Sequence, residues 1–169
     1  MTLRRAVLGF WILSMTLVVH TTADADPSWK IATGQFWPVS FVNGETTSGP
    51  TATSLRLGCS IPIGDKWVMY QEAGIAAPNS TFNPSPRAAI GPGYKVTDAL
   101  LVGLAAAYQI NPAHGNVTWT HSAAVSLLAS TTISKGIAFV VSVGFGRGLR
   151  ENGVWGMNVQ PTMMFTLPI

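Results

Sequence analysis

Bulky apolar and small residues alternate along much of the chain. In residues 99–110 (ALLVGLAAAYQI), the even positions from Leu100 to Ile110 are apolar and, apart from Ala106, bulky, and the odd positions are mostly alanine or glycine. A helix of this length would span only about 18 Å, which is too short to cross a bilayer. Alternation with a period of two instead predicts a strand that has one bulky apolar face and one small face.

The same alternation recurs and predicts eight strands. Their expected ranges are residues 28–43, 51–63, 66–77, 87–97, 99–110, 117–132, 136–147 and 154–167. The connections between these strands alternate between long segments and tight turns such as Gly64-Asp65 and Thr97-Asp98. Short turns on one side and longer loops on the other are typical of up-and-down membrane barrels. The sequence therefore predicts an all-β fold, an eight-stranded antiparallel up-and-down transmembrane β-barrel.

The second face of these strands distinguishes a membrane barrel from a soluble one. It carries Ser, Thr, Gly and Ala, whereas a strand face in contact with water usually carries Lys and Glu. Small side chains of this kind fit the narrow interior of an eight-stranded barrel. A soluble, secreted, lipocalin-like carrier with its apolar face turned inward is the alternative that shares the same alternation.

Four charged side chains fall within the predicted strands, namely Arg56, Glu72, Arg87 and Lys95. The phase of their neighbours places all four on the small, inward face. A Lys or Arg on the lipid face near the bilayer midplane would cost about 2–4 kcal/mol. Because a tight turn joins the strands of Arg56 and Glu72, we predict an ion pair between them in the lumen. Arg87 and Lys95 are predicted as further lumenal charges.

Outward-facing aromatic residues are expected at both ends of the barrel, where they would form two girdles at the membrane interfaces. The predicted set is Trp67 and Tyr94 beside the tight turns, and Tyr108, Trp119, Phe145 and Trp155 beside the longer loops. Cys59 also falls on the apolar face, where we expect it to be inert in lipid.

The N-terminus has the pattern of a secretory signal peptide. A pair of arginines precedes the apolar run 6–19, and the small residues Ala23 and Ala25 follow it. This order of basic, apolar and small residues predicts a leader over 1–25, which leaves residues 26–169 as the mature barrel. The single cysteine, Cys59, excludes an internal disulfide framework, so in an exported protein it is either buried or a free thiol.

Charge is scarce in this chain. Charged residues make up 10% of the sequence, against about 25% in an average soluble domain. The chain has ten basic and seven acidic residues, and the predicted leader holds two arginines and one aspartate. The predicted mature chain therefore has 8 basic and 6 acidic residues, and its net charge is +2. Such a balance offers no basic surface for nucleic acid.

The sequence shows no arrangement of residues that would support catalysis or hold a cofactor. His121 and Ser122 are adjacent, so on a strand they point to opposite faces and cannot act as base and nucleophile. His114 has no acidic neighbour, which gives a metal site little support. The glycine-rich segments lack the Lys-Ser/Thr of a phosphate loop. We therefore expect no enzymatic activity, no cofactor and no metal.

The predicted mature chain resembles the small eight-stranded outer-membrane barrels of the OmpA/OmpX-like superfamily. The resemblance is one of pattern, including GPGYKVTDALLVGL, in which a glycine-rich strand, a tight turn and an apolar strand follow one another. It implies a location in the bacterial outer membrane, contact with membrane lipid, and folding by the outer-membrane barrel assembly machinery. No protein partner follows from it.

Two positions depart from related patterns. Such barrels often end in a terminal aromatic residue that the assembly machinery reads, whereas here Phe165 is four residues from the C-terminus. The barrels that deacylate lipid A place His and Ser two residues apart on the lipid face, and Ala123 stands at that position after His121. The expected function is a structural or surface role without catalysis. A narrow channel or a barrel that binds a small solute is the alternative within the same fold.

Overall fold

The computed structural model describes residues 28–42, 44–79, 84–111, 120–149 and 153–168, so the predicted signal peptide lies outside the described residues. No helix in these ranges is long and apolar enough to cross a membrane. The strands are β1 (Ser28–Val42), β2 (Glu45–Ser48), β3 (Ala52–Ile63), β4 (Trp67–Pro78), β5 (Ser85–Lys95), β6 (Leu100–Asn111), β7 (Thr120–Ser134), β8 (Ile137–Gly148) and β9 (Trp155–Thr166).

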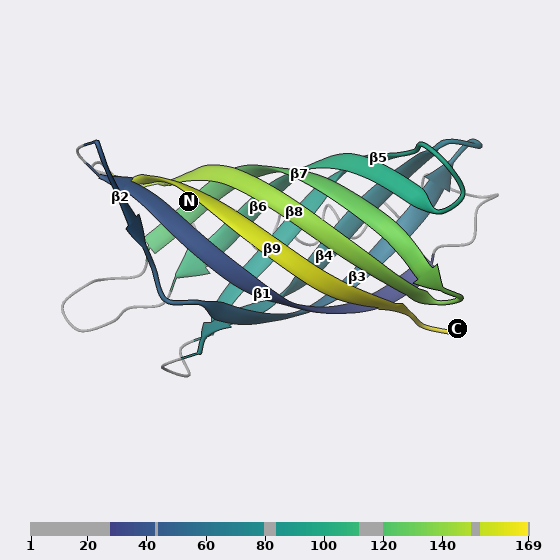
Figure 1. Cartoon of the computed structure of the whole chain (residues 1–169), viewed down its shortest axis with the longest axis horizontal. Coiled ribbons are helices and arrows are strands. Elements are labelled where there is room, and N and C mark those ends of the chain that lie inside the picture. Colours follow the sequence, from purple (N-terminus) through teal and green to yellow (C-terminus); the bar gives the residue numbers. More distant parts are fainter. Residues whose placement is uncertain (1–27, 43, 80–83, 112–119, 150–152, 169) are drawn as a thin grey trace, which may run out of the picture.

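Eight of these strands form a closed barrel. Each strand from β3 to β8 pairs antiparallel with the next, β1 pairs with β3, and β1 also pairs with β9 from Lys30↔Thr166 to Phe41↔Trp155. The strands are long and tilted, so the barrel is an elongated cylinder (Figure 1). Closure leaves no free sheet edge among these eight strands, which is the condition for crossing a bilayer with strands. The predicted fold class is confirmed.

The two ends of the barrel differ in their connections. Tight turns join β3 to β4, β5 to β6 and β7 to β8 at one end, whereas the strand ends that longer sequence segments separate lie at the other end (Figure 1). Gly64 and Gly136 have φ of 67° and 80°, a conformation that favours glycine and allows a strand to reverse within a few residues. We call these the tight-turn end and the long-loop end.

The short strand β2 was not predicted. The predicted strand ranges leave residues 44–50 as a connection, but the chain turns back at Gly44, and Glu45–Ser48 pairs with Val39–Val42 of β1. All four side chains of β2 are exposed, so there is no apolar alternation by which the sequence could reveal it. The pairing of β1 with β3 ends at Phe36, and beyond that residue β2 pairs with β1 in place of β3.

Strand β5 begins two residues earlier than predicted, at Ser85 rather than at 87. The sequence predicts a connection over residues 78–86, a segment that contains prolines, which cannot donate a hydrogen bond to a sheet. In the structure Pro86 pairs only with Ile75 of β4, and the pairing of β5 with β6 starts at Arg87. Proline is tolerated there because one side of the strand is still open.

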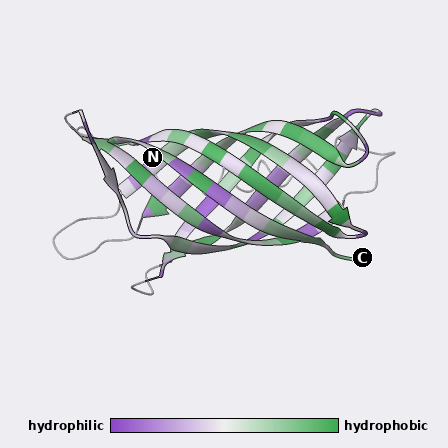
Figure 2. Ribbon diagram, in the orientation of Figure 1, coloured by the Kyte–Doolittle hydropathy of each residue, from purple (hydrophilic) through white to green (hydrophobic). Residues whose placement is uncertain are grey.

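The barrel has an apolar exterior and a polar interior. Large apolar side chains such as Leu55, Leu127 and Phe145 lie on the outer face and are more than half exposed, whereas Ser54 and Gln160 are fully buried in the lumen. Figure 2 shows hydrophobic and hydrophilic residues alternating along the strands. A lipocalin-like carrier would have the opposite arrangement, with its apolar face inside, so that alternative is wrong.

Candidate lumenal site

Arg56 and Glu72 lie side by side inside the barrel. Arg56 projects from β3 and Glu72 from β4, at diagonal positions, because Arg56 is paired with Gly74 and Gly58 with Glu72. The Nη1 atom of Arg56 is 2.7 Å from both Oε1 and Oε2 of Glu72. A Cβ at position 74 would lie 2.8 Å from Cγ of Arg56, so glycine leaves the space through which the arginine reaches its partner.

Further hydrogen bonds hold the same pair from other strands. Nη2 of Arg56 donates to Oγ1 of Thr162 on β9 at 2.6 Å, and the hydroxyl of Tyr70 donates to Oε2 of Glu72. Residues 56 and 162 are far apart in sequence, so this contact exists only because the barrel closes. The carboxylate is thus fixed by an arginine and a tyrosine.

Arg87 extends the cluster towards a second polar chain. Its Nη2 atom lies 3.5 Å from Oε1 of Glu72, and its Nη1 atom donates to Oε1 of Gln160 at 2.9 Å. Nε2 of Gln160 in turn donates to Oγ of Ser54 at 2.7 Å, and that hydroxyl donates to the carbonyl oxygen of Gly34. Hydrogen bonds therefore connect β1, β3, β4, β5 and β9 across the lumen. The lumenal network is defined here as Ser54, Arg56, Tyr70, Glu72, Arg87, Gln160 and Thr162.

The lumenal network carries excess positive charge. Its two arginines face one carboxylate, and the side chains of Arg56, Arg87 and Glu72 are only 6%, 9% and 3% exposed. The Nε atoms of both arginines are buried without a hydrogen-bond partner in the described part of the chain. Burying ionic groups costs free energy unless their charge is compensated, and here one carboxylate faces two guanidinium groups.

Two cavities flank the lumenal network. A cavity of about 170 Å³ opens towards the long-loop end, lined by Ser40, Gln109, Ser122 and Asn158 among others. A smaller cavity of about 60 Å³ lies towards the tight-turn end. Arg87 lines both, and Arg56 and Glu72 line the smaller one. A plug of polar side chains therefore separates the two halves of the lumen.

The four charged residues singled out in the sequence have different places. Arg56, Glu72 and Arg87 meet in the lumenal network, whereas Lys95 is exposed at the last residue of β5, at the tight-turn rim. Lys30 was not singled out, yet its Nζ atom donates to Oγ of Ser60 at 3.0 Å and it lines the smaller cavity.

The neutral members of the lumenal network were not predicted as site residues. Tyr70 shares the inward phase of Glu72 two residues away, and Gln160 and Thr162 lie on the inward face of their strand. This phase was the available signal. Which inward residues meet across the lumen, however, depends on the closure between β1 and β9.

Outward aromatic pairs lie at both ends of the barrel. Trp67 and Tyr94 meet edge to face at the tight-turn end, with ring centroids 5.0 Å apart. Phe145 and Trp155 stack at the long-loop end at 5.1 Å. Tyr108 stacks on His121 at that end, and its hydroxyl lies 2.6 Å from Nδ1 of the histidine. The remaining predicted girdle residue, Trp119, lies outside the described residues.

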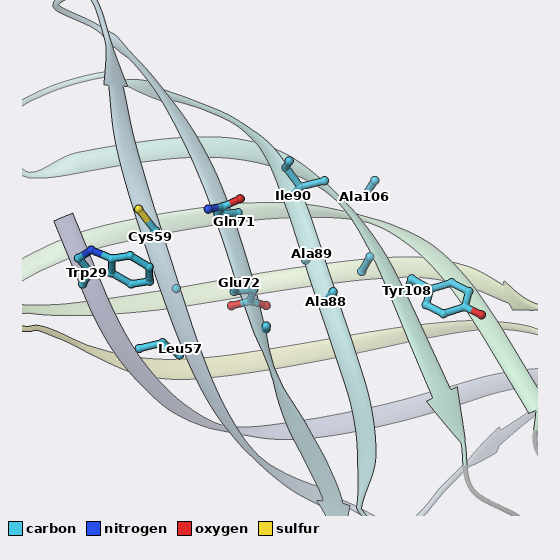
Figure 3. Close-up of a pocket in the computed structure, with 13 residues that line it drawn as sticks. Trp29, Leu57, Cys59, Gln71, Glu72, Ala88, Ala89, Ile90, Ala106 and Tyr108 are labelled. Carbon is cyan, nitrogen blue, oxygen red and sulfur yellow. The ribbon is translucent and has the colours of Figure 1, made fainter. Parts of the chain in front are cut away.

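A groove crosses the outer face of β1 and β3–β6. Figure 3 shows its lining side chains, from Trp29 on β1 to Tyr108 on β6. The small residues Ala73, Ala88 and Ala106 leave it a volume of about 150 Å³. Cys59 lies here beside Trp29 and Gln71, its pairing partners, and is only 2% exposed. It is on the outer face, as expected, but neighbouring side chains cover it, so it does not project into lipid.

Residue types that often serve in metal binding or acid–base chemistry are dispersed over the described part of the barrel. The described ranges contain no group of three or more His, Cys, Asp or Glu residues that could hold a metal ion. His121 points outward beside Tyr108, and Ser122 lines the larger lumenal cavity, so they are on opposite faces of β7.

The fold matches solved membrane barrels although the sequence does not. No family model matches the chain, and no curated protein matches its sequence. Neisserial surface protein A (NspA) aligns over 84% of this chain and 99% of its own, with a TM-score of 0.53 and 9% identity. Ail, the attachment invasion locus protein of Yersinia pestis, aligns over 83% of this chain and 99% of its own, with a TM-score of 0.47 and 10% identity.

A de novo designed transmembrane β-barrel aligns over 83% of this chain and 95% of its own, with a TM-score of 0.49 and 15% identity. The similarity to NspA, together with the closed sheet, shows that the chain has the fold of the small eight-stranded outer-membrane barrels.

Proposed function

We propose that the chain is an outer-membrane barrel protein with a structural or surface role and no catalytic activity. The apolar exterior supports residence in a bilayer, because a water-exposed surface of this composition would aggregate. The aromatic pairs at the two ends match the two membrane interfaces. In this proposal residues 1–25 are cleaved on export, and the barrel assembly machinery inserts residues 26–169 into the bacterial outer membrane.

The observation that carries a structural role is the closed lumen. Hydrogen bonds and ion pairs connect opposite walls through Arg56, Glu72, Arg87 and Gln160, all of which are at least nine-tenths buried. An eight-stranded barrel is already narrow enough to be filled by side chains. Because side chains fill the lumen, the proposed role is that of a membrane-embedded scaffold whose outer surface contacts lipid.

A narrow channel is the second candidate, and the two cavities favour it. They lie on either side of the lumenal network, and Arg87 lines both. A rearrangement of the lumenal network that includes Arg87 would be needed to join them. In this alternative the lumenal network is a constriction whose excess positive charge favours anions.

Conductance in planar bilayers distinguishes the two candidates. The structural proposal predicts that the wild-type barrel adds no current to that of the bare bilayer. A Glu72→Ala, Arg87→Ala double variant should produce small, steady channel currents. A Glu45→Ala variant, altered on exposed β2, serves as the control for folding and insertion. Steady single-channel currents from the wild-type protein would support the channel and contradict the structural proposal.

A further inference from the structure

The smaller lumenal cavity gathers more positive than negative charge. Lys30, Arg56 and Arg87 line it together with Glu72, which makes a net charge of +2 when all four are ionised. The carboxylate is already held on both oxygens by Arg56 and on one by Tyr70. Burying a charge without a counter-charge costs free energy. A further negative group in the cavity would compensate the excess positive charge, and the described residues do not supply one.

Hydrogen-bond donors without a partner among the described residues belong to side chains that line this cavity. The Nε atoms of Arg56 and Arg87 have no partner among the described residues, and both side chains are more than nine-tenths buried. The Nζ atom of Lys30 has three donors, of which one is directed to Oγ of Ser60. Guanidinium and ammonium donors form their strongest hydrogen bonds with anions.

Hydroxyl groups contribute further polar lining to the same cavity. Ser126 and Ser130 of β7, Ser142 of β8 and Thr162 of β9 line the same cavity. Each hydroxyl can rotate to donate a hydrogen bond to an anion. The volume of about 60 Å³ exceeds the roughly 10–15 Å³ that one water requires, so there is room for a small ion.

We propose that this cavity binds a small inorganic anion, held by Lys30 and Arg87 with hydroxyls from β7 and β8. Water alone could satisfy the free donors, but it would not compensate the charge. The site is enclosed by the barrel wall, so the anion comes from solution and not from a lipid headgroup. The proposal holds whether or not the lumen conducts, because it concerns a bound ion and not a path.

Anion-dependent stability of the refolded barrel in detergent micelles tests this proposal. Sodium chloride or sodium phosphate replaces sodium gluconate at constant ionic strength, since gluconate is too large for the cavity. The unfolding equilibrium is followed in urea. Binding at 100 times the dissociation constant should lower the unfolding constant about 100-fold, and the effect should follow a saturation curve. An unfolding constant that is the same in all three salts would overturn the proposal.

Two lysine variants separate a bound anion from general charge screening. Lys30→Gln removes a charge that lines the cavity, and Lys66→Gln removes an exposed charge from a tight turn. The anion response should weaken at least tenfold in Lys30→Gln and stay unchanged in Lys66→Gln. Equal responses in both variants, or a response that never saturates, would contradict a site. Isothermal titration with inorganic phosphate provides a second readout that is independent of unfolding.

Discussion

Gln71 and Glu72 are neighbours on β4 and point to opposite faces of the barrel wall. Glu72 is buried in the lumenal network, whereas Gln71 lies in the outer groove beside Cys59 (Figure 3). A slip of one residue in the register of β4 would exchange them and place an ionised carboxylate in lipid. The lumenal network therefore also fixes the register of this strand.

Removing the carboxylate of the lumenal network should destabilise the barrel strongly. Glu72→Gln leaves Arg56 and Arg87 buried without a counter-charge. Breaking a buried ion pair from one side typically costs about 3–5 kcal/mol, and urea unfolding in micelles measures the loss. The exposed Glu45→Gln variant should change stability by less than about 0.5 kcal/mol.

A double variant tests whether the loss arises from the unpaired charge. The double variant Arg56→Gln, Glu72→Gln should lose less unfolding free energy than the two single variants lose together. Each single substitution leaves the other charge buried without its partner, and the double variant avoids this cost. Additive losses would show that Arg56 and Glu72 are not coupled and would contradict the ion pair.

The same substitution should have opposite effects on the two faces of the wall. Gln71→Leu replaces an amide on the lipid face. The pairing partners of Gln71 are Cys59 and Ile90, which offer the amide no strong hydrogen bond. The substitution should therefore stabilise the barrel in lipid by about 1–3 kcal/mol. Gln160→Leu removes the acceptor of Arg87 in the lumen and should destabilise it by about 1.5–3 kcal/mol.

Unfolding of both glutamine variants in phospholipid vesicles checks this contrast. Stabilisation by Gln160→Leu would mean that the lumen prefers apolar residues. Loss of stability in Gln71→Leu would place Gln71 in a polar environment and not in lipid.

Charge on the outer face should be penalised according to depth. Leu127 lies at the middle of β7 and is 66% exposed, whereas Leu149 follows the end of β8 and is 57% exposed. Leu127→Lys should cost about 2–4 kcal/mol in a bilayer and Leu149→Lys about 0–1 kcal/mol. Unfolding from phospholipid vesicles measures the two losses of unfolding free energy. Equal losses at the two positions would argue against a membrane around the middle of the barrel.

The period-two pattern was sufficient to predict the barrel, because one face of each strand meets lipid and the other fills a narrow lumen. The same phase placed Arg56 and Glu72 inward, and the tight turn after β3 placed them on adjacent strands. Short-range sequence relationships therefore predict contacts between strands that follow one another.

Contacts across the lumen could not be predicted in this way. Gln160 meets Ser54, and Thr162 meets Arg56, because β1 pairs with β9 in a register that no local pattern encodes. Strand β2 was missed because its polar residues do not alternate with apolar ones. Lys30 was missed because its role depends on a cavity formed by strands that are distant in sequence.

The most direct test of the account is the electrophoretic mobility of the expressed protein before and after heating. The full chain is produced in a bacterium with an outer membrane, and that membrane is extracted with detergent. We predict that the protein is found in the extract and that boiling in SDS shifts its band, because a closed barrel resists SDS until it is heated. Recovery in the periplasm or medium without detergent, with no shift on boiling, would contradict a membrane barrel.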